Sequence, residues 1–160
     1  MKKRSAGIIV YRNKGKDIEI LLVHLGGPFW KNKKNSWDLP KGEVKEGEDF
    51  LMTALREFEE ETGLKLEDED IKKISFFKDL DRGDKIIKFF ILEKDFGDNL
   101  KPQSNEVLIE FPPKSGKKIV IPEVDQMKYF SLEEAENYVL NYLKEFIKEI
   151  KKFLKNSASN

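Results

Sequence analysis

The stretch Gly42–Leu64, GEVKEGEDFLMTALREFEEETGL, decides the fold of this 160-residue chain. Its apolar residues recur at spacings of three and four, which places them on one face of a helix: Leu51, Ala54, Leu55 and Phe58. Glu48 and Asp49 supply negative charge at the start, where the helix dipole favours it. Gly63 follows the last periodic residue and suits a left-handed C-cap. We therefore predict a helix over Asp49–Thr62.

A second face of this helix is acidic. Glu57, Glu60 and Glu61 recur at i, i+3 and i+4, so their carboxylates lie together and repel one another. Arg56 cannot neutralise all three charges, whereas a hard divalent cation such as Mg²⁺ takes carboxylate oxygens as ligands. The alternative is an ordinary solvated acidic face, which is the usual meaning of a glutamate cluster.

The wider spacing of the stretch favours the metal site. It reads G, five residues, E, seven residues, then R-E-hydrophobic-x-E-E-x-G-hydrophobic, and every fixed position is filled. The residues at these positions are Gly42, Glu48, Arg56, Glu57, Phe58, Glu60, Glu61, Gly63 and Leu64. This pattern resembles the Nudix box, the signature of hydrolases that cleave nucleoside diphosphates linked to another group.

The resemblance implies a fold and a reaction. Nudix domains are α/β/α sandwiches with a mixed β-sheet, so we expect an α+β fold of this type, with a C-terminal helix. The implied activity is hydrolysis of a pyrophosphate bond in a nucleoside polyphosphate, which makes a small nucleotide the expected partner. The implied cofactor is Mg²⁺ or Mn²⁺.

The resemblance also assigns roles within the box. The implied metal ligands are the carbonyl of Gly42 and the carboxylates of Glu57, Glu60 and Glu61. Arg56 would orient a box glutamate, and Glu48 would support the same network. The general base differs among Nudix enzymes, so Glu57 and Glu61 are both candidates, as is a loop glutamate outside the box.

Bulk properties limit the class of protein. The length fits one domain, for which we expect a core of about residues 4–155 and a frayed tail over 156–160. Thirty basic and thirty acidic residues cancel, so no overall field favours nucleic acid or an anionic membrane. The chain has no cysteine and no apolar run of membrane-spanning length, and we expect a cytoplasmic protein. A monomer and a homodimer are both compatible with the sequence.

Short β-branched and apolar runs predict strands on both sides of the box. We expect strands at Ala6–Tyr11, Ile18–Leu25, Ile71–Leu80, Lys85–Glu93, Val107–Phe111, Lys118–Ile121 and Lys128–Phe130. A loop is expected over Phe96–Ser104.

The C-terminal segment is predicted to be helical. Ser131 and Glu134 form a capping box, so a helix should begin there and run to about Tyr138. A helical apolar stripe then extends from Leu143 to Leu154. We interpret it as packing on the sheet; the alternative is a membrane-surface or partner helix.

Substrate contacts are expected outside the acidic face. Lys41 could reach a phosphate or could simply be exposed, and Trp30 and Trp37 could stack on a nucleobase or pack in the protein. Glu106 and Glu110 are the candidate glutamates outside the box. The single histidine, His24, is expected to be packed or hydrogen-bonded and not catalytic.

The sequence does not determine which nucleotide is the substrate. The segment from Ser36 to Val44 resembles Nudix hydrolases related to diadenosine tetraphosphate hydrolase. Predicted NTP pyrophosphohydrolases are resembled by four other segments: Gly26–Trp30, Ser104–Asn105, Pro112–Gly116 and Pro122–Asp125. The downstream Tyr and Pro that mark dinucleoside polyphosphate hydrolases and ADP-ribose pyrophosphatases are both absent between Lys65 and Lys101. Phe76 or Phe77 could replace an aromatic contact, although strand alternation should bury at least one of them. A nucleotide sensor with little activity, an ADP-ribose or nucleotide-sugar hydrolase and an RNA-end hydrolase are the alternatives.

Overall fold

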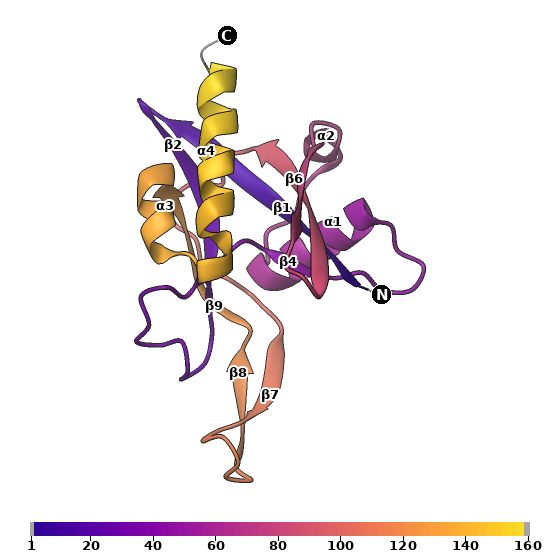
Figure 1. The fold of residues 1–160 in the computed structure, drawn as a ribbon, viewed down its shortest axis with the longest axis vertical. Helices are drawn as coiled ribbons and strands as arrows, with labels where there is room; N and C mark the ends of the chain where they lie inside the picture. The colour runs from indigo at the N-terminus through magenta and orange to yellow at the C-terminus, as the bar shows by residue number, and fades with distance from the viewer. Residues whose placement is uncertain (1, 159–160) are drawn as a thin grey trace.

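The computed structural model describes residues 2–158 (Figure 1). Among these residues, the strands of the main sheet are β1 (Lys3–Lys14), β2 (Asp17–Leu25), β3 (Trp37–Asp38), β4 (Lys41–Glu43), β5 (Ser75–Asp81), β6 (Lys85–Glu93) and β9 (Val124–Ser131). A separate hairpin consists of β7 (Glu106–Glu110) and β8 (Lys118–Pro122). The helices are α1 (Phe50–Thr62), α2 (Asp68–Ile71), α3 (Leu132–Tyr138), the 3₁₀ turn η1 (Asn141–Leu143) and α4 (Lys144–Ala158).

The main sheet is mixed, as expected. Strand β1 lies at its centre, pairing in parallel with β6 and antiparallel with β2 and β4. Strand β9 adds to β2, and β5 adds to the other side of β6. The parallel pair joins strands far apart in the sequence, which is possible because the box helix lies in the long connection between them.

The two faces of the sheet support two cores. On β1, Ile8 and Val10 point towards α1 and pack with the fully buried Phe58, whereas Ile9 points to the opposite face. There it joins residues of α4 such as Ile147. This alternation follows from the two-residue period of a strand. The sheet is therefore covered by α1 on one side and by α3 and α4 on the other (Figure 1), which confirms the α+β sandwich with a C-terminal helix.

The box helix forms where the sequence predicts it. Asp49 is the N-cap, and its side chain accepts a hydrogen bond of 2.8 Å from the backbone N–H of Met52. Gly63 ends the helix with φ of 76°, and its N–H donates to the carbonyl of Glu59 at 2.8 Å. Both capping interactions join residues close together in the sequence, so the sequence alone predicts them.

The C-terminal helices pack on the sheet. The Ser131 hydroxyl accepts a hydrogen bond from the N–H of Glu134 at 3.1 Å, and α3 ends at Tyr138. The predicted apolar stripe of α4 is buried in the core, with Phe153 as a half-exposed exception. This arrangement confirms the packing interpretation. Within residues 2–158, no helix is both long and apolar enough to cross a membrane.

Several predicted boundaries are wrong. The strand expected over Ile71–Leu80 begins only at Ser75, because Asp70 accepts a hydrogen bond from the Glu67 N–H and stabilises the short helix α2. Strands β1 and β9 are longer than predicted, since each pairs along its length with distant partners. Residues 156–158, expected to fray, continue α4; the rest of that predicted tail, 159–160, lies outside the described residues.

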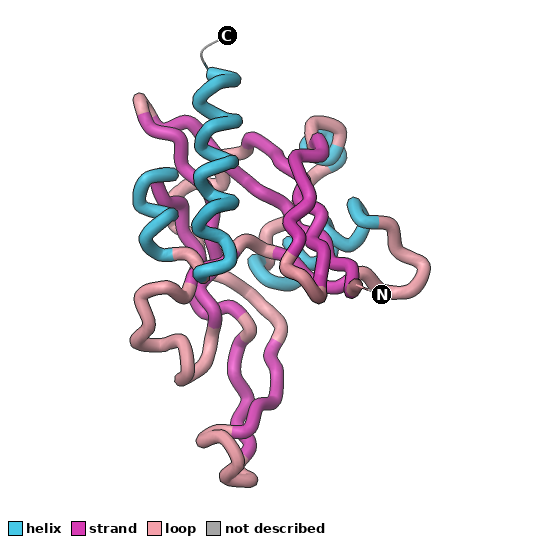
Figure 2. The backbone as a smooth tube through the Cα atoms, in the orientation of Figure 1, coloured by secondary structure: helices cyan, strands magenta, loops and turns pink. Residues whose placement is uncertain are grey.

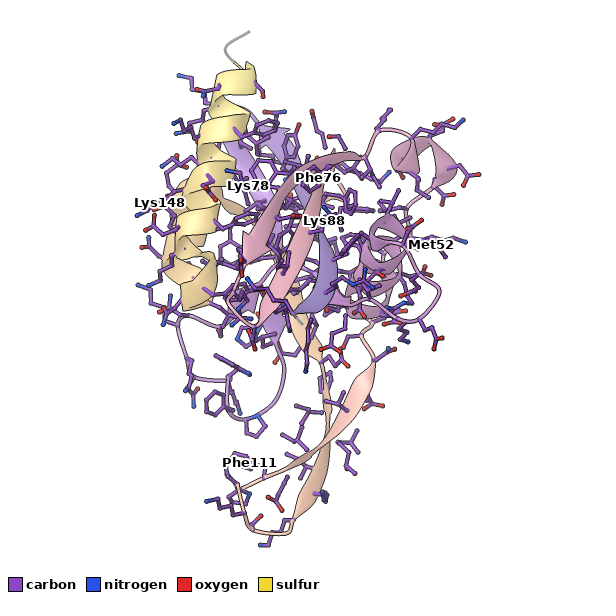
Figure 3. The ribbon with its side chains drawn as sticks, turned by 45° about the vertical axis from the view of Figure 1, so that its right-hand side comes forward. Met52, Phe76, Lys78, Lys88, Phe111 and Lys148 are labelled. Atoms are coloured by element: carbon purple, nitrogen blue, oxygen red, sulfur yellow. The ribbon has the colours of Figure 1, made fainter. Side chains whose placement is uncertain are left out.

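The two phenylalanines of β5 do not follow strict alternation. A register shift between Phe76 and Lys78 places Phe77 partly buried against the core, and Phe76 is 52% exposed. One ring is thus covered, as expected, and the other lies on the outer surface, where Figure 3 labels it.

Candidate active site

The acidic face of α1 lies against β4. Strand β4 pairs with β1 so that Gly42 is opposite Ala6, and this brings Gly42 next to the carboxylate of Glu57. A Cβ built on Gly42 would overlap that carboxylate. A residue other than glycine at position 42 would therefore have to displace the Glu57 carboxylate, since only glycine lets the backbone and the carboxylate approach so closely.

Arg56 organises the carboxylates of the box. Its guanidinium donates to Glu48 at 2.7 and 2.9 Å, to Glu57 at 2.8 Å and to Glu60 at 3.1 Å. Glu48 also accepts a hydrogen bond from the hydroxyl of Thr53 at 3.0 Å. The structure thus brings together the arginine and the glutamates that the sequence singled out.

The carboxylates of the box differ in their electrostatic environments. The hydrogen bonds from Arg56 are the largest of the effects that lower the pKa of Glu48 to about 2. Burial raises the pKa of Glu57, against the opposing effect of Arg56. Burial also raises the pKa of Glu61 well above its ordinary value, and the negative charge of Asp38 adds to this shift. A cation placed among these groups would reverse the destabilisation of their charged forms.

Lys41 places a positive charge next to Asp38 and Glu61. Its ammonium is 3.2 Å from the Asp38 carboxylate, and the negative charge of Asp38 is the main cause that raises the pKa of Lys41. The hydroxyl of Tyr142 donates to the other Asp38 oxygen at 2.6 Å. The side chain of Lys41 is only 18% exposed, so the simple solvent-exposed alternative is wrong.

A cavity of 270 Å³ opens beside Glu61. The charged residues that line it are Asp38, Lys41, Glu61 and Glu123. Its apolar lining residues include Trp30, Val107 and Ile121. Larger hollows of 420, 440 and 460 Å³ contain no residue of the box, and one of 280 Å³ is lined by Arg56 and Glu59 but by none of Glu57, Glu60 and Glu61. We therefore regard the 270 Å³ cavity as the candidate active site.

Some predicted substrate contacts are not at the cavity. Trp37 is 8% exposed and packs edge-to-face against Phe130 and His24, so its alternative role as a base-stacking surface is wrong. His24 is hydrogen-bonded through Nδ1 to Asp125 at 2.6 Å, as expected. Trp30, in contrast, lines the cavity.

The predicted glutamates outside the box lie elsewhere on the hairpin. Glu106 is exposed at the start of β7 and is not among the residues that line the cavity. Glu110 accepts hydrogen bonds from the N–H groups of Lys114 and Gly116 at the hairpin's distal turn. That contact explains Glu110 as a turn-stabilising residue.

Sequence reasoning missed Glu123, Asp38 and Tyr142 as site residues. Glu123 enters through the β8–β9 connection, and its charge raises the pKa of both Glu57 and Glu61. Asp38 and Glu123 stand in segments whose likeness to known families was visible, so a signal existed for them. Tyr142 reaches Asp38 from 104 positions away, and no local pattern marks it.

The carboxylates of Glu48, Glu57 and Glu60 are oriented towards Arg56, whereas Glu61 lies nearer to Asp38 and Lys41. Within residues 2–158, no group of three or more Asp, Glu, His or Cys side chains has the geometry to hold a metal ion. The donor chemistry nevertheless suits a hard cation, since Glu57 and Glu61 are partly desolvated like charges beside an unobstructed glycine backbone.

Comparisons with known proteins agree with this geometry. The NUDIX domain family model matches residues 1–154. An RNA pyrophosphohydrolase of Bartonella henselae is 28% identical over 153 residues, covering 89% of this chain and 83% of the relative. An RNA pyrophosphohydrolase of Pelagibacter ubique is 56% identical, but over only 34 residues, 21% of this chain and 22% of that protein. Among solved structures, an Ap4A hydrolase of C. elegans, in a binary complex, superposes with a TM-score of 0.65 at 20% identity, covering 96% of this chain and 98% of that one.

Proposed function

This chain belongs to the Nudix family of hydrolases, and from that premise we propose that it uses Mg²⁺ to hydrolyse a pyrophosphate bond in a nucleoside polyphosphate. One observation carries the proposal: Glu61 and Lys41 line one cavity, and the carboxylate of Glu57, from the same helix, lies against Gly42. Such a site offers acceptors for a cation and a positive group for a phosphate, which are the parts that phosphate chemistry needs.

The metal would be held by the box. Gly42 through its carbonyl, and Glu57, Glu60 and Glu61 through their carboxylates, are the proposed ligands for Mg²⁺ or Mn²⁺. Bound there, a divalent ion would neutralise phosphate oxygens and help to activate water. The ion would also relieve the repulsion that Glu61 experiences from Glu57.

The remaining roles fall to residues around the box. Arg56 holds Glu57 and Glu60 in place, and Glu48 holds Arg56 with two hydrogen bonds. Lys41 lines the cavity, and its ammonium can contact a substrate phosphate there as a point charge. The candidate general bases are Glu57 and Glu61, and Glu123 joins them because it lies outside the box and lines the same cavity as Glu61.

The proposed substrates are a dinucleoside tetraphosphate or an NTP-type compound. A second candidate is the 5′ end of RNA, favoured by the Bartonella relative that matches most of the chain. The loop Lys31–Ser36 would contribute Lys31, Lys33 and Lys34 to such a substrate. A non-catalytic sensor would have no need of the intact set of box carboxylates.

The test is hydrolysis of a substrate panel with phosphate-product analysis, in Mg²⁺ and again with EDTA. Dinucleoside polyphosphates, NTPs, nucleotide sugars and a 5′-triphosphorylated RNA form the panel. Turnover that stops with EDTA is expected, and the products identify the bond that is attacked. Absence of turnover across the whole panel would refute the proposed enzyme.

A matched pair of variants tests the site. Glu60→Gln should lower kcat by about 10²-fold or more, as the loss of a charge contact in the transition state does. Glu59→Gln is the control, because Glu59 is exposed on another face of α1 and should keep its rate. An unchanged rate in Glu60→Gln, with normal metal dependence, would remove Glu60 from the site.

A further inference from the structure

The β7–β8 hairpin has an apolar inner face, and on its outer face one apolar pair stands among the charged residues Glu106, Glu110 and Lys118. Leu108 and Val120 pair across the outer face and are 63% and 60% exposed. On the inner face the partly buried pairs are Val107 with Ile121 and Ile109 with Ile119. The hairpin extends away from the sandwich, with its side chains projecting to either side (Figure 3). An isolated hairpin is marginally stable in water, and an exposed apolar surface commonly marks a binding site.

The base of the hairpin is fixed to the loop that follows β2. The N–H of Gly26 donates to the carbonyl of Glu123 at 3.0 Å. A Cβ built on Gly27 would lie 2.6 Å from Cδ1 of Ile121, so the loop and the inner face are in direct contact. Figure 2 shows this loop beside the start of the hairpin. Trp30 belongs to the same loop, and the cavity lies where the two segments meet.

The cavity is therefore lined by two kinds of side chain. Glu61, Lys41 and Glu123 are charged, whereas Trp30, Val107 and Ile121 are apolar. A ligand that satisfies both kinds carries an anionic group next to a flat apolar one. A nucleotide has that composition, because its phosphate and its base are joined through one sugar.

We propose that Trp30 and the base of the β7–β8 hairpin form a nucleobase subsite, in which the base lies between the indole ring and the side chains of Val107 and Ile121. This inference rests on the proposed function, because it takes the charged lining residues as the phosphate site. The whole cavity, with its charged residues included, has a volume of 270 Å³, below the usual range for drug-sized ligands, so it accommodates one nucleotide. A second nucleoside of a dinucleotide would lie outside it.

The lining also limits how the base is read. Among the apolar lining residues that the structure describes, only Trp30 has a side-chain hydrogen-bonding group, its indole N–H. Stacking is tolerant of base identity because every base has a π-face. The subsite should therefore distinguish nucleotides from base-free phosphates, while accepting adenine and guanine with similar affinity.

The first experiment compares ligands with and without a base. AMP, GMP and ribose 5-phosphate are titrated into the full chain by calorimetry, with Mg²⁺ present. AMP and GMP should bind at least about fivefold more tightly than ribose 5-phosphate, the lower end of what a base–aromatic stack contributes. Trp30→Leu should remove that advantage and leave ribose 5-phosphate unaffected, whereas Trp30→Phe should retain part of it. Equal affinities of AMP and ribose 5-phosphate for the unmodified chain would overturn the proposal.

Two neighbouring positions on β8 give a matched control. Ile121→Ser changes the cavity face of the hairpin, and Val120→Ser changes the exposed outer face one residue away. The first should weaken AMP by about fivefold or more, and the second should not change it. Equal losses in both variants would indicate a general effect on the hairpin and contradict the subsite.

Intrinsic fluorescence provides a readout that needs no turnover. The chain has two tryptophans and Trp37 is buried, so acrylamide quenching reports mainly on Trp30. AMP should protect Trp30 from acrylamide. If AMP protects Trp30 but the substrate panel shows no hydrolysis, the proposed reaction fails and the subsite stands. If light scattering shows a dimer that Ile121→Ser dissociates and AMP gives no protection, the inner face binds a second copy of the chain and the subsite is wrong.

Discussion

Replacing Gly42 by alanine tests the closest contact in the proposed site. Gly42 is outside the set of glycines with positive φ in residues 2–158, so alanine is compatible with its backbone conformation. The new Cβ would nevertheless overlap the carboxyl carbon and both oxygens of Glu57. The new Cβ would lie 2.0 Å from the Glu57 carboxyl carbon, so either Glu57 or the β4 backbone has to move by about 1.4 Å or more to reach ordinary van der Waals contact at 3.4 Å.

The magnitude follows from what Glu57 contacts. A displacement of this size can cost about 10²-fold in rate when it misplaces a reacting group, so kcat should fall by about that factor. The 2.8 Å hydrogen bond from Arg56 to Glu57 should weaken as well. Because Arg56 keeps its bonds to Glu48, the loss of stability should be modest, about 1 kcal/mol.

The assay pairs Mg²⁺-dependent turnover with urea unfolding. Glu43→Ala is the control, because its exposed side chain lies one residue away in β4 and should change neither quantity greatly. A Gly42→Ala protein with unchanged kcat would show that the approach of Gly42 to Glu57 is not required, and would refute the steric argument. A protein that loses several kcal/mol would show that the substitution disturbs the sheet and not the site alone.

Three further perturbations have defined outcomes. Phe58→Ala should lower the free energy of unfolding by about 3–5 kcal/mol, since Phe58 is fully buried between α1 and the sheet; urea unfolding measures it, and a loss below about 1 kcal/mol would contradict the packing. Glu48 has its pKa lowered to about 2, so it stabilises the fold fully above its ordinary pKa and loses this contribution as the pH falls towards 2. Glu48→Gln should therefore flatten the acid side of the stability–pH profile, and an unchanged profile would contradict the contact with Arg56. Tyr142→Phe should destabilise the fold by about 1–3 kcal/mol by removing a donor from Asp38, and an unchanged midpoint in thermal or urea unfolding would contradict that bond.

The sequence alone determined the features that depend on neighbours along the chain. The period of α1, its Asp49 and Gly63 ends, and the shared face of Glu57, Glu60 and Glu61 all follow from 3.6 residues per turn. Because these interactions span only a few residues, the amino-acid sequence shows their spacing directly. The same property identified the family, whose signature is mostly one helix.

Only the tertiary structure decided which distant residues share the cavity. Pairing of β9 with β2 and the attachment of the hairpin to the Gly26 loop bring Glu123, Ile121 and Trp30 to one place. Trp30 and Trp37 look alike in sequence, yet a strand pairing buries one and a loop leaves the other at the cavity. Such choices depend on non-local strand pairing and burial, for which no short-range spacing is a guide.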